Sequence, residues 1–565
     1  MIGWSEGVCP PQCRCGPDSR GRRTVFCPSG SLSGPVPVGL MDSDIEIMRI
    51  TAPENQENCL TMGPIFQGFQ KLEEVHITHS NVPAIGKHSF WGVPSLRLLN
   101  LTSNNISQVL DNNFRGLVNL LELHLDWNRI ESMGSGTFQH LHELRVLSLR
   151  GNRIHQLSPR LFLKLAKLRF LDLSDNDLEH LDPEVFKDVQ ELRTFSCRRC
   201  NLRNMNPHIY SLLSNLAHLD LGENQFKYLD REEFRDLKKL MSLRLDGNHF
   251  PVVLEGTFTS QGRLQYLNLA RSQIAKVTNH AFDNLTSLLE LDLSYNKLDR
   301  LEPITFQPLA PNLRSLLVSG NNIKVDDFLY VLQVTTRLKD LSMADLDVKH
   351  GLPLGLLAQV DTLKHLNLSG NGLNRFPFQI LTPVPGMTTL DLSRNNLHSL
   401  DEGSVAKMEF IPNVYLNDNP WACDLCHILP MLKSNASWKA SAICSLPGQL
   451  SGRSIATLTA EQLSLCGSGL DYKEEGFAGL ALTHKTQLGL IAAGSAVALL
   501  VITMAAVVAG LLYNKNHTAY YYTNEQKRKA AKDICNGFNA EKKVSIATID
   551  EITKDPELEV LAETS

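Results

Sequence analysis

One pattern of residues recurs along most of this 565-residue chain with a period of 24. The pattern is L-x-x-L-x-L-x-x-N, and a separate aromatic column keeps the same phase. A fixed period of this length indicates stacked, similar units, since one unit alone cannot bury its apolar face. The first position falls at Leu72, Leu96, Leu120, Leu144, Leu168, Leu192, Leu216, Leu240, Leu264, Leu288, Leu313, Leu338, Leu363, Met387 and Ile411. The aromatic column is Phe90, Phe114, Phe138, Phe162, Phe186, Tyr210, Phe234, Phe258, Phe282 and Phe306.

The columns predict the architecture. Positions 1, 4 and 6 fill a core, and the side-chain amide of asparagine at position 9 pairs with backbone groups that turn inward after a short strand. The pattern resembles that of leucine-rich repeat proteins. It predicts an α/β-type solenoid, a curved horseshoe of about 15 repeats of 24–25 residues, with parallel strands on the concave face and an aromatic spine on the convex side. A weaker strand, IEIMRI at 45–50, precedes the set. The asparagines are Asn104, Asn128, Asn152, Asn176, Asn224, Asn248, Asn296, Asn321, Asn371, Asn395 and Asn419.

The stretch FSCRRC at 195–200 has the spacing of half a zinc site or a redox pair. In the repeat frame Cys197 takes position 6 and Cys200 takes position 9, where buried apolar residues and asparagine or cysteine are accepted. Extended chain covers about 10 Å over three residues, which is too far for a comfortable disulfide. Zinc would need two more soft ligands nearby, and the sequence offers none. We therefore predict a structural pair that does not bridge.

Two cysteine clusters flank the repeats. CPPQCRCGPDSRGRRTVFC at 9–27 and NPWACDLCHILPMLK from Asn419, followed by two further cysteines, resemble the terminal caps of extracellular leucine-rich repeat proteins. The second departs from the usual C-x-C, because C-x-x-C stands there. The resemblance implies the disulfides Cys9–Cys15, Cys13–Cys27, Cys423–Cys444 and Cys426–Cys466. Caps shield the core of the terminal repeats from water. Cys59 is left over, and we expect it to be unpaired.

Disulfide-bonded caps need an oxidising compartment, so we expect the repeats to be extracellular. Five N-x-[ST] sequons agree with this and are candidate glycosylation sites. Only MIGWSEGV precedes Cys9, and it does not resemble a signal peptide, so we expect a processed, truncated or alternatively started form. The sequons are Asn100, Asn105, Asn284, Asn367 and Asn435.

The segment 488–513 is uncharged and mostly apolar, long enough to span a bilayer. Basic residues follow it and acidic residues precede it, which predicts a cytoplasmic C-terminus. The tail is too short for a kinase or a Toll-type signalling module. Tyr522-Thr-Asn524 could engage a cytoplasmic phosphotyrosine adaptor, or the nearby tyrosines could be interfacial anchors. The predicted divisions are an N-terminal cap at 9–44, repeats at 45–419, a C-terminal cap at 420–466, a stalk at 467–487, a transmembrane helix at 488–513 and a tail at 514–565.

No enzyme motif is found: there is no phosphate loop, nucleophile elbow or metal-binding histidine pair on a helix. We therefore predict no enzyme, no cofactor and no metal. The net charge of −5 does not suggest a nucleic-acid partner.

Binding remains as the function. The plan resembles single-pass leucine-rich repeat receptors of the Capricious/Tartan type, which implies cell–cell recognition at the plasma membrane. The expected partner is an extracellular or cell-surface protein, with homophilic and heterophilic binding both open. The alternative is an auxiliary subunit that modulates another membrane receptor or channel. Innate immune sensing is disfavoured by the short tail.

The repeat frame also predicts where a partner would bind. Positions 2, 3, 5, 7 and 8 are expected to face solvent on the concave side. Large aromatic residues and a row of arginines at position 2 of successive repeats fall there, and these residue types are enriched at binding hot spots. Arg150, Arg198 and Arg199 lie nearby, with Asp172 and Asp175 as partial counter-charges. Glycans at Asn100 and Asn367 would shield the two ends of this face. The candidate partner-binding residues are Trp127, Arg145, Arg169, Phe170, Arg193, Tyr266 and Tyr295.

Overall fold

The computed structural model describes residues 9–348 and 351–465. They lie in the first of two compact units, Met1–Leu470; the second unit is Asp471–Ser565. The predicted stalk, membrane segment 488–513 and tail fall outside the described residues. Among the residues that are described, no helix has both the length and the apolar character needed to cross a membrane.

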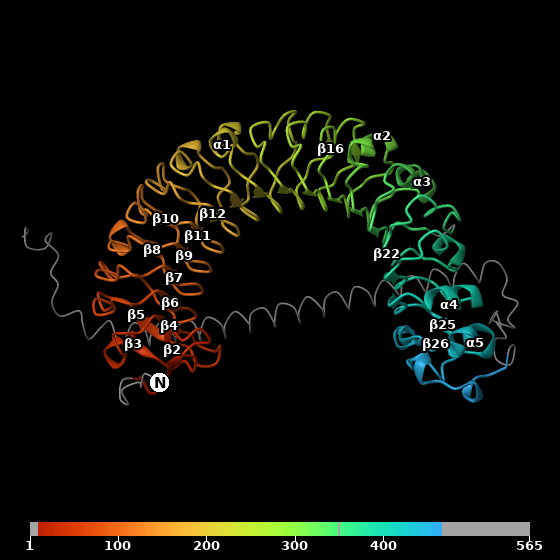
Figure 1. Ribbon diagram of the computed structural model, residues 1–565, viewed down its shortest axis with the longest axis horizontal. Coiled ribbons are helices and arrows are strands. Elements are labelled where there is room, and N and C mark those ends of the chain that lie inside the picture. Colours follow the sequence, from red (N-terminus) through yellow and green to blue (C-terminus); the bar gives the residue numbers. More distant parts are fainter. Residues whose placement is uncertain (1–8, 349–350, 466–565) are drawn as a thin grey trace, which may run out of the picture. The chain divides into compact units, whose positions relative to one another are not determined.

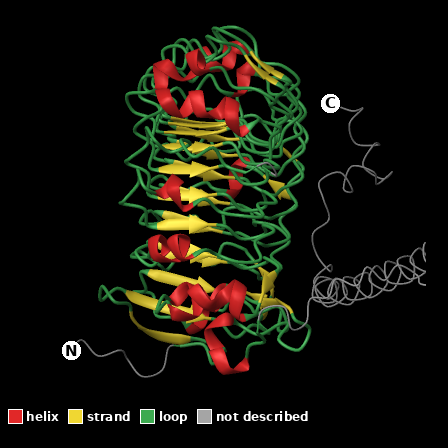
Figure 2. Cartoon of the chain, turned by 90° about the vertical axis from the view of Figure 1, so that its right-hand side faces the viewer, coloured by secondary structure: helices red, strands yellow, loops and turns green. Residues whose placement is uncertain are grey.

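The repeats stack into an arc with strands along its inner side, as predicted (Figure 1). Seen from the end of the arc, the short strands lie one above another (Figure 2). The main sheet has 18 strands; β1 (Arg14–Pro17) pairs antiparallel with β2, and every later pairing in it is parallel and in register. The parallel strands are β2 (Arg23–Cys27), β4 (Ile47–Ile50), β6 (Glu74–Ile77), β7 (Leu98–Asn100), β9 (Glu122–His124), β11 (Val146–Ser148), β12 (Phe170–Asp172), β13 (Thr194–Ser196), β14 (His218–Asp220), β15 (Ser242–Arg244), β17 (Tyr266–Asn268), β19 (Glu290–Asp292), β20 (Ser315–Leu317), β21 (Asp340–Ser342), β22 (His365–Asn367), β23 (Thr389–Asp391) and β24 (Asn413–Tyr415).

From β7 onward each strand of the main sheet covers positions 3 to 5 of its repeat, so that position 4 points into the core and positions 3 and 5 point to the concave side. Leu120, Leu123 and Leu125 occupy positions 1, 4 and 6 of one repeat and are fully buried. The weak strand expected at 45–50 is present as β4 and joins the N-terminal cap to the first repeats.

The asparagines of position 9 form a hydrogen-bonded ladder along the arc. In Asn152 the side-chain Nδ2 donates to Leu125 O at 3.0 Å and to Leu149 O at 2.8 Å, one carbonyl in each of two neighbouring repeats. Its Oδ1 accepts from the backbone N–H of Ile130 at 3.1 Å. Buried backbone groups are thereby satisfied without a second sheet, and one side chain ties two repeats together.

The aromatic column packs inside the convex side as predicted. Phe114, Phe138 and Phe162 are fully buried and stacked, with ring centroids 5.8 and 6.4 Å apart. Between Phe186 and Tyr210 no ring contact is formed in the described structure; Phe186 instead meets the edge of Phe195 at 5.4 Å. The spine is therefore interrupted at the repeat that contains FSCRRC.

Short helices and strands of two or three residues lie outside the main sheet. Helix α1 begins with the pattern Asn-Pro: the Asn206 side chain caps it, accepting from His208 N–H, and proline stands in its first turn. Helix α3, the longest among the described residues, lies in the 25-residue repeat that begins at Leu313. The α-helices are α1 (Pro207–Leu212), α2 (Pro303–Phe306), α3 (Val325–Val334), α4 (Glu402–Met408) and α5 (Leu425–Lys433). The 3-10 turns are η1 (Val38–Leu40), η2 (Asp111–Asn113), η3 (Pro183–Val185), η4 (Gln307–Leu309), η5 (Phe378–Leu381), η6 (Ser437–Ser441), η7 (Ile455–Thr457) and η8 (Ala460–Gln462). The outer strands pair as β3 (Ser33–Pro35) with β5 (Cys59–Thr61), β8 (Gln108–Val109) with β10 (Ser132–Met133), β16 (Val252–Val253) with β18 (Lys276–Val277), and β25 (Trp421–Ala422) with β26 (Cys444–Leu446).

Disulfides lie in both caps. Cys9 bonds to Cys15, Cys13 to Cys27, and Cys423 to Cys444, which are pairings that the cap resemblance implies. Cys426 is disulfide-bonded as well, while Cys466, its expected partner, lies outside the described residues. Cys59 is also disulfide-bonded, so the expectation of an unpaired cysteine is wrong.

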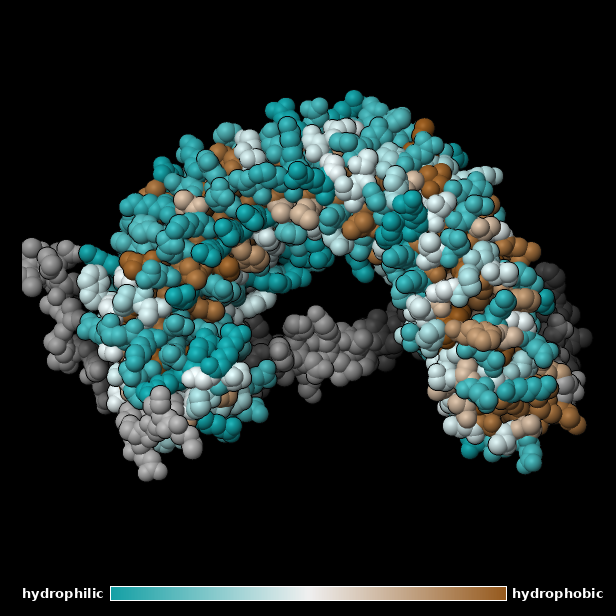
Figure 3. All heavy atoms as spheres, viewed as in Figure 1, coloured by the Kyte–Doolittle hydropathy of each residue, from teal (hydrophilic) through white to brown (hydrophobic). Residues whose placement is uncertain are grey.

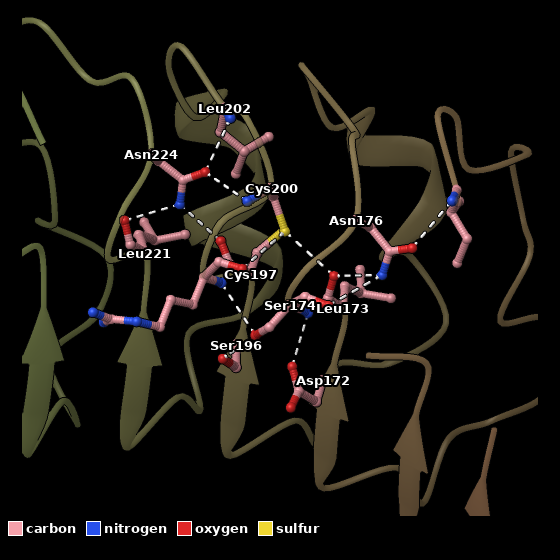
Figure 4. The surroundings of a disulfide bond; sticks show 12 residues. Asp172, Leu173, Ser174, Asn176, Ser196, Cys197, Cys200, Leu202, Leu221 and Asn224 are labelled. Atoms are coloured by element: carbon pink, nitrogen blue, oxygen red, sulfur yellow. Dashed lines mark hydrogen bonds between the residues drawn. A yellow bond between two sulfur atoms is a disulfide. The ribbon is translucent and has the colours of Figure 1, made fainter. Parts of the chain in front are cut away.

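The expectation that Cys197 and Cys200 do not bridge is also wrong. The two residues form a disulfide with their Cα atoms 5.5 Å apart. The chain does not continue extended after β13: Arg199 adopts a left-handed conformation with φ of 53°, and the turn shortens the span far below the length of extended chain. Figure 4 shows the bond inside the asparagine ladder.

Candidate protein-binding surface

The concave face is built of parallel rows, because the strands are in register. Positions 2, 3 and 5 of successive repeats follow one another across the sheet at the spacing of neighbouring strands, roughly 4.8 Å. The expectation that position 7 faces solvent is wrong for many repeats, where a small residue lies buried beneath the turn. These buried residues are Ser174, Ala270, Ser294, Ser319, Ala344, Ser369 and Ser393.

Two of the candidate aromatic residues lie on the concave strands. Phe170 is the first residue of β12, is half-buried, and is paired in register with Val146 of β11 and Thr194 of β13. Tyr266 is the first residue of β17 and is 46% exposed. Three strands, β13, β14 and β15, lie between the two, so they belong to different parts of the face.

The other two aromatic residues lie in the turns at position 8, where the backbone is left-handed. Trp127 has φ of 54° and Tyr295 has φ of 55°, and each is about half exposed. Each ring lies against a glycine at position 8 of the next repeat: a Cβ on Gly151 would stand 2.4 Å from the Trp127 ring, and one on Gly320 would stand 2.4 Å from the Tyr295 ring. The sequence contains a signal for this ring-on-glycine packing, because a large residue at position 8 of one repeat is followed by a glycine at position 8 of the next repeat.

The arginine row consists of Arg145, Arg169 and Arg193, and all three side chains are exposed. Their backbones lie in consecutive steps of the sheet, since Arg169 N–H donates to Arg145 O and Arg193 N–H to Arg169 O, both at 2.9 Å. In the part of the chain that is described, none of the three takes part in an ion pair. Three like charges therefore stand side by side, next to the half-buried ring of Phe170.

The neighbouring arginines differ, because carboxylates of the same surface pair with them. Arg150 Nε lies 2.7 Å and Arg199 Nε 2.5 Å from the two carboxylate oxygens of Asp175. Burial raises the pKa of Asp175, but the hydrogen bond from Arg199 and the charge of Arg150 outweigh it, so that the pKa is lowered. Asp175 is thus the counter-charge of Arg150 and Arg199, and it does not pair with the arginine row.

Asp172, the other expected counter-charge, is different. Its carboxylate accepts a hydrogen bond from Ser174 N–H at 2.8 Å, and no ion pair involving it occurs in the described ranges. Burial raises the pKa of Asp172, and its hydrogen bonds with Ser174, which lower the pKa, offset only part of that rise. It does not neutralise the arginine row.

Arg198 is the centre of a network that the sequence did not predict. Its guanidinium lies 2.5 Å from Asp246, 2.6 Å from Glu223 and 3.4 Å from Asp220. Burial raises the pKa of Asp246, but its hydrogen bonds and attraction to Arg198 prevail, and the pKa is lowered. Arg198 and Asp246 are 48 residues apart, and both occupy position 7 in repeats that are two steps from each other. The repeat register was therefore the one feature of the sequence that could have predicted this pair.

Replacing Arg198 with alanine is expected to lower the free energy of unfolding by about 3 kcal/mol, because the buried Asp246 loses its close partner and keeps only the longer contact with the exposed Arg244 at 3.6 Å. The folded pKa of Asp246 lies below its ordinary value of 3.8. The contribution is therefore present above pH 4 and lost as the pH falls through the folded pKa. Urea unfolding of both proteins between pH 3 and pH 7 measures this.

Arg231→Ala is the matched control, since Arg231 pairs with Glu255 in the next repeat at 2.8 Å but both side chains are exposed. Its effect is expected to stay below about 1 kcal/mol. A similar loss in both variants, or a loss for Arg198→Ala that does not shrink in acid, would contradict the role of the network.

Two of the five sequons lie on the concave strands. Asn100 ends β7 and Asn367 ends β22, and each side-chain oxygen accepts from the backbone N–H two residues later, at 2.9 and 3.0 Å. The other three lie off these strands: Asn105 donates to Asn81, Asn284 to Thr259 O, and Asn435 is exposed. Glycosylation at all five stays a prediction.

The visible face in Figure 3 is mostly hydrophilic, with hydrophobic side chains scattered among the polar ones. Within the described ranges, no three His, Cys, Asp or Glu side chains gather so as to hold a metal ion. The arrangement offers charge and exposed rings for a macromolecular partner.

Comparison with known sequences agrees with the fold. The leucine rich repeat family matches residues 70–130, 119–178, 190–250 and 262–323. Trophoblast glycoprotein of Macaca fascicularis is 30% identical over 196 residues, which cover 30% of this chain and 46% of that protein. Nephrocan of Mus musculus is 26% identical over 165 residues, which cover 29% of this chain and 31% of that protein. The chain thus spans less than half the length of these curated relatives.

Solved structures show the same fold at low identity. A leucine-rich repeat protein of Leptospira interrogans superposes with a TM-score of 0.55 at 22% identity, covering 67% of this chain and 91% of that one. Toll, in the Drosophila complex with Spatzle, superposes with a TM-score of 0.52 at 21% identity, covering 76% of this chain and 59% of that one. The described residues therefore share the leucine-rich repeat fold.

Proposed function

We propose that this leucine-rich repeat protein is a cell-surface recognition or adhesion receptor that binds a protein partner on its concave face. The observation that carries the proposal is the contrast between two sets of arginines. Arg150, Arg198 and Arg199 are paired with carboxylates of their own surface, whereas Arg145, Arg169 and Arg193 are exposed and are not ion-paired among the described residues. Aligned like charges repel unless a partner supplies the opposite charge.

Phe170 adds an apolar contact beside that row. A half-buried aromatic ring next to arginines is the composition that binding hot spots favour. The ring starts β12, the strand between those that follow Arg145 and Arg193, so a partner that reaches the row also reaches the ring. We place the centre of the docking site at strands β11 to β13.

The proposal includes a single-pass arrangement with the repeats outside the cell, supported by the cap disulfides and by the apolar run at 488–513. The five sequons are proposed glycosylation sites in this arrangement. Toll, with which the fold is shared, is in complex with a protein, Spatzle. An auxiliary role beside another membrane receptor or channel is the competing outcome of the experiment below.

Reversing the arginine row by Arg145→Glu, Arg169→Glu and Arg193→Glu is expected to weaken partner binding by roughly 100-fold, because each charge that faced an anionic group then repels it. Phe170→Ala alone is expected to weaken it by roughly 30-fold. The full-length chain is displayed on suspended cells, partners are captured by proximity labelling, and the binding of the captured partner is then measured by titration.

The control reverses Arg231, Arg235 and Arg300, exposed arginines outside the concave strands. Surface levels are measured for every variant. If the arginine-row variants reach the surface and bind as well as the control, the docking site lies elsewhere. Aggregation of the displaying cells supports adhesion, whereas capture of a membrane receptor or channel in the same cell without aggregation supports the auxiliary role.

A further inference from the structure

The loops that lead into the strands form one long side of the arc, where the starts of the strands lie one above another (Figure 2). In each repeat this side consists of the two residues before position 1 and of position 2. Backbone hydrogen bonds join position 2 of one repeat to the next: Ala217 N–H donates to Arg193 O, and Lys364 N–H to Lys339 O, both at 2.8 Å. Side chains at these positions therefore follow one another along the arc at the strand spacing, roughly 4.8 Å.

This side carries a surplus of positive charge, although the net charge of the chain is −5. From the repeat at Leu96 to the repeat at Leu363 it holds 12 basic residues against Glu143, Glu191 and Asp361. All of the basic side chains are exposed except Arg314, which is half-buried. We call these 12 residues the basic edge: Arg97, Arg145, Lys167, Arg169, Arg193, Lys238, Lys239, Arg263, Arg314, Arg337, Lys339 and Lys364.

The protein itself neutralises few of these charges. Among the described residues, Lys167 is the one member of the basic edge that takes part in an ion pair, with Glu143 at 2.5 Å. The opposite side of the sheet differs. Positions 7 and 8 of the same repeats carry four arginines and five carboxylates, and several of these pair with one another, as Arg198 does with Asp246. The basic edge is therefore the side whose charge is left for a partner.

The floor of the concave face, between these two sides, is acidic. Positions 3 and 5 of the same repeats carry six carboxylates and one arginine. A long anion is therefore repelled from the floor and attracted to the basic edge. The basic edge extends over eleven steps of the sheet, a length on the order of 50 Å. The carboxylates are Glu122, Asp172, Asp220, Glu290, Asp292 and Asp340, and the arginine is Arg244.

The residues between the charges favour a polysaccharide over a protein as the partner of this side. No aromatic residue stands on it from Pro94 to Lys364, and its two exposed large apolar side chains among the described residues, Val118 and Met241, lie five repeats apart. A protein interface has an apolar centre with aromatic anchors, whereas on this side positive charge alone is continuous. Sulfate oxygens, like those of phosphate, accept the paired N–H donors of arginine.

We propose that the basic edge binds a sulfated polysaccharide, a linear chain of the glycosaminoglycan type that lies along the side of the arc. Arg145, Arg169 and Arg193 belong both to this edge and to the proposed docking site, so the polysaccharide and the protein partner meet at the arginine row. The inference goes beyond the proposed function and rests on it only in placing the repeats outside the cell, where such polysaccharides occur.

Heparin, a sulfated polysaccharide prepared in defined lengths, is the probe. The full-length protein in a nonionic detergent is immobilised and titrated by surface plasmon resonance at about 0.15 M salt. Heparin is expected to bind, with an affinity that rises with oligosaccharide length until the chain spans the edge and that falls as salt is added. Desulfated heparin is expected to bind roughly tenfold more weakly or less.

Two results of this titration would overturn the proposal. The first is that heparin does not bind, or that desulfated heparin of the same length binds equally well. The second is that a polyglutamate chain of equal charge binds as tightly as heparin, which would assign the edge to an acidic protein instead.

Two sets of substitutions locate the site, one in the middle of the edge and one toward its C-terminal end. Each set removes three exposed charges from the line and is expected to weaken heparin binding by roughly tenfold. The two sets combined are expected to weaken it by roughly 100-fold. The middle set is Lys238→Gln, Lys239→Gln and Arg263→Gln, and the other is Arg337→Gln, Lys339→Gln and Lys364→Gln.

The control removes three exposed arginines that lie off this side and is expected to change heparin binding by less than about twofold. Equal losses in all three sets would mean that net charge alone governs binding and would overturn the edge. Neither test set includes the arginine row or Phe170, and heparin is measured without a protein partner. Failure here therefore leaves the docking site at β11 to β13 untouched, and failure of that site leaves the edge untouched. The control set is Arg231→Gln, Arg235→Gln and Arg300→Gln.

Discussion

Replacing Phe138 with alanine is expected to lower the free energy of unfolding by about 3–5 kcal/mol. The side chain is fully buried, and its ring stacks on Phe114 at 5.8 Å and on Phe162 at 6.4 Å. The truncation leaves a cavity between three repeats, and a solenoid has few other contacts that could collapse into it, because each repeat touches only its neighbours. Urea unfolding followed by circular dichroism measures the effect.

Phe410→Ala is the control for that prediction. Phe410 is 84% exposed, so its loss is expected to change the free energy by no more than about 0.5 kcal/mol. An effect of Phe138→Ala below 1 kcal/mol would mean that the aromatic spine contributes little and that the leucine columns alone hold the stack.

The second large effect is expected for Cys444→Ser. The disulfide Cys423–Cys444 joins β25 to β26 with a sequence separation of 21, and its loss is expected to cost about 3 kcal/mol. The cap that it closes covers the last repeat: the Trp421 indole is buried and donates to Leu416 O at 3.0 Å. We expect the variant to be retained inside the cell and to unfold at lower urea concentration.

Surface biotinylation and urea unfolding test the cap prediction together. Ser445→Ala, an exposed neighbour in the same strand, is the matched control and is expected to behave like the wild type. Normal surface display of Cys444→Ser with an unchanged unfolding midpoint would show that the cap holds without its disulfide.

The repeat register could be predicted from the sequence because the same residue types recur in phase, and the structure places Leu120, Leu123 and Leu125 in the core as expected. The conformation of the turn after each strand could not be predicted in the same way. Position 8 is left-handed at Arg199, as it is at Trp127 and Tyr295, and this turn brings Cys197 and Cys200 together, whereas the spacing of extended chain gives no indication of it.

The charge distribution was predicted only in part for a related reason. Arg145, Arg169 and Arg193 are exposed as the frame implies, but the pairing of Arg198 with Asp246 depends on side chains that reach across two repeats. The position of a residue in the repeat predicts where its backbone lies. Ion pairing between repeats depends in addition on the length of the side chains and on whether the residues between them are small. Gly222 illustrates this: a Cβ there would stand 2.2 Å from an Arg198 nitrogen.

The asparagine ladder bears on how such a chain can change in length over generations. Each ladder side chain bonds to its own repeat and to the one before it, with the same geometry at Asn152 and at Asn395. A duplicated block of 24 residues would therefore meet matching donors and acceptors at both of its boundaries. A single inserted residue between the strand and the ladder position would displace every bond at that joint. Whole-repeat duplication or deletion is the change in length that this backbone chemistry tolerates, and it alters the reach of the arc while leaving every joint the same.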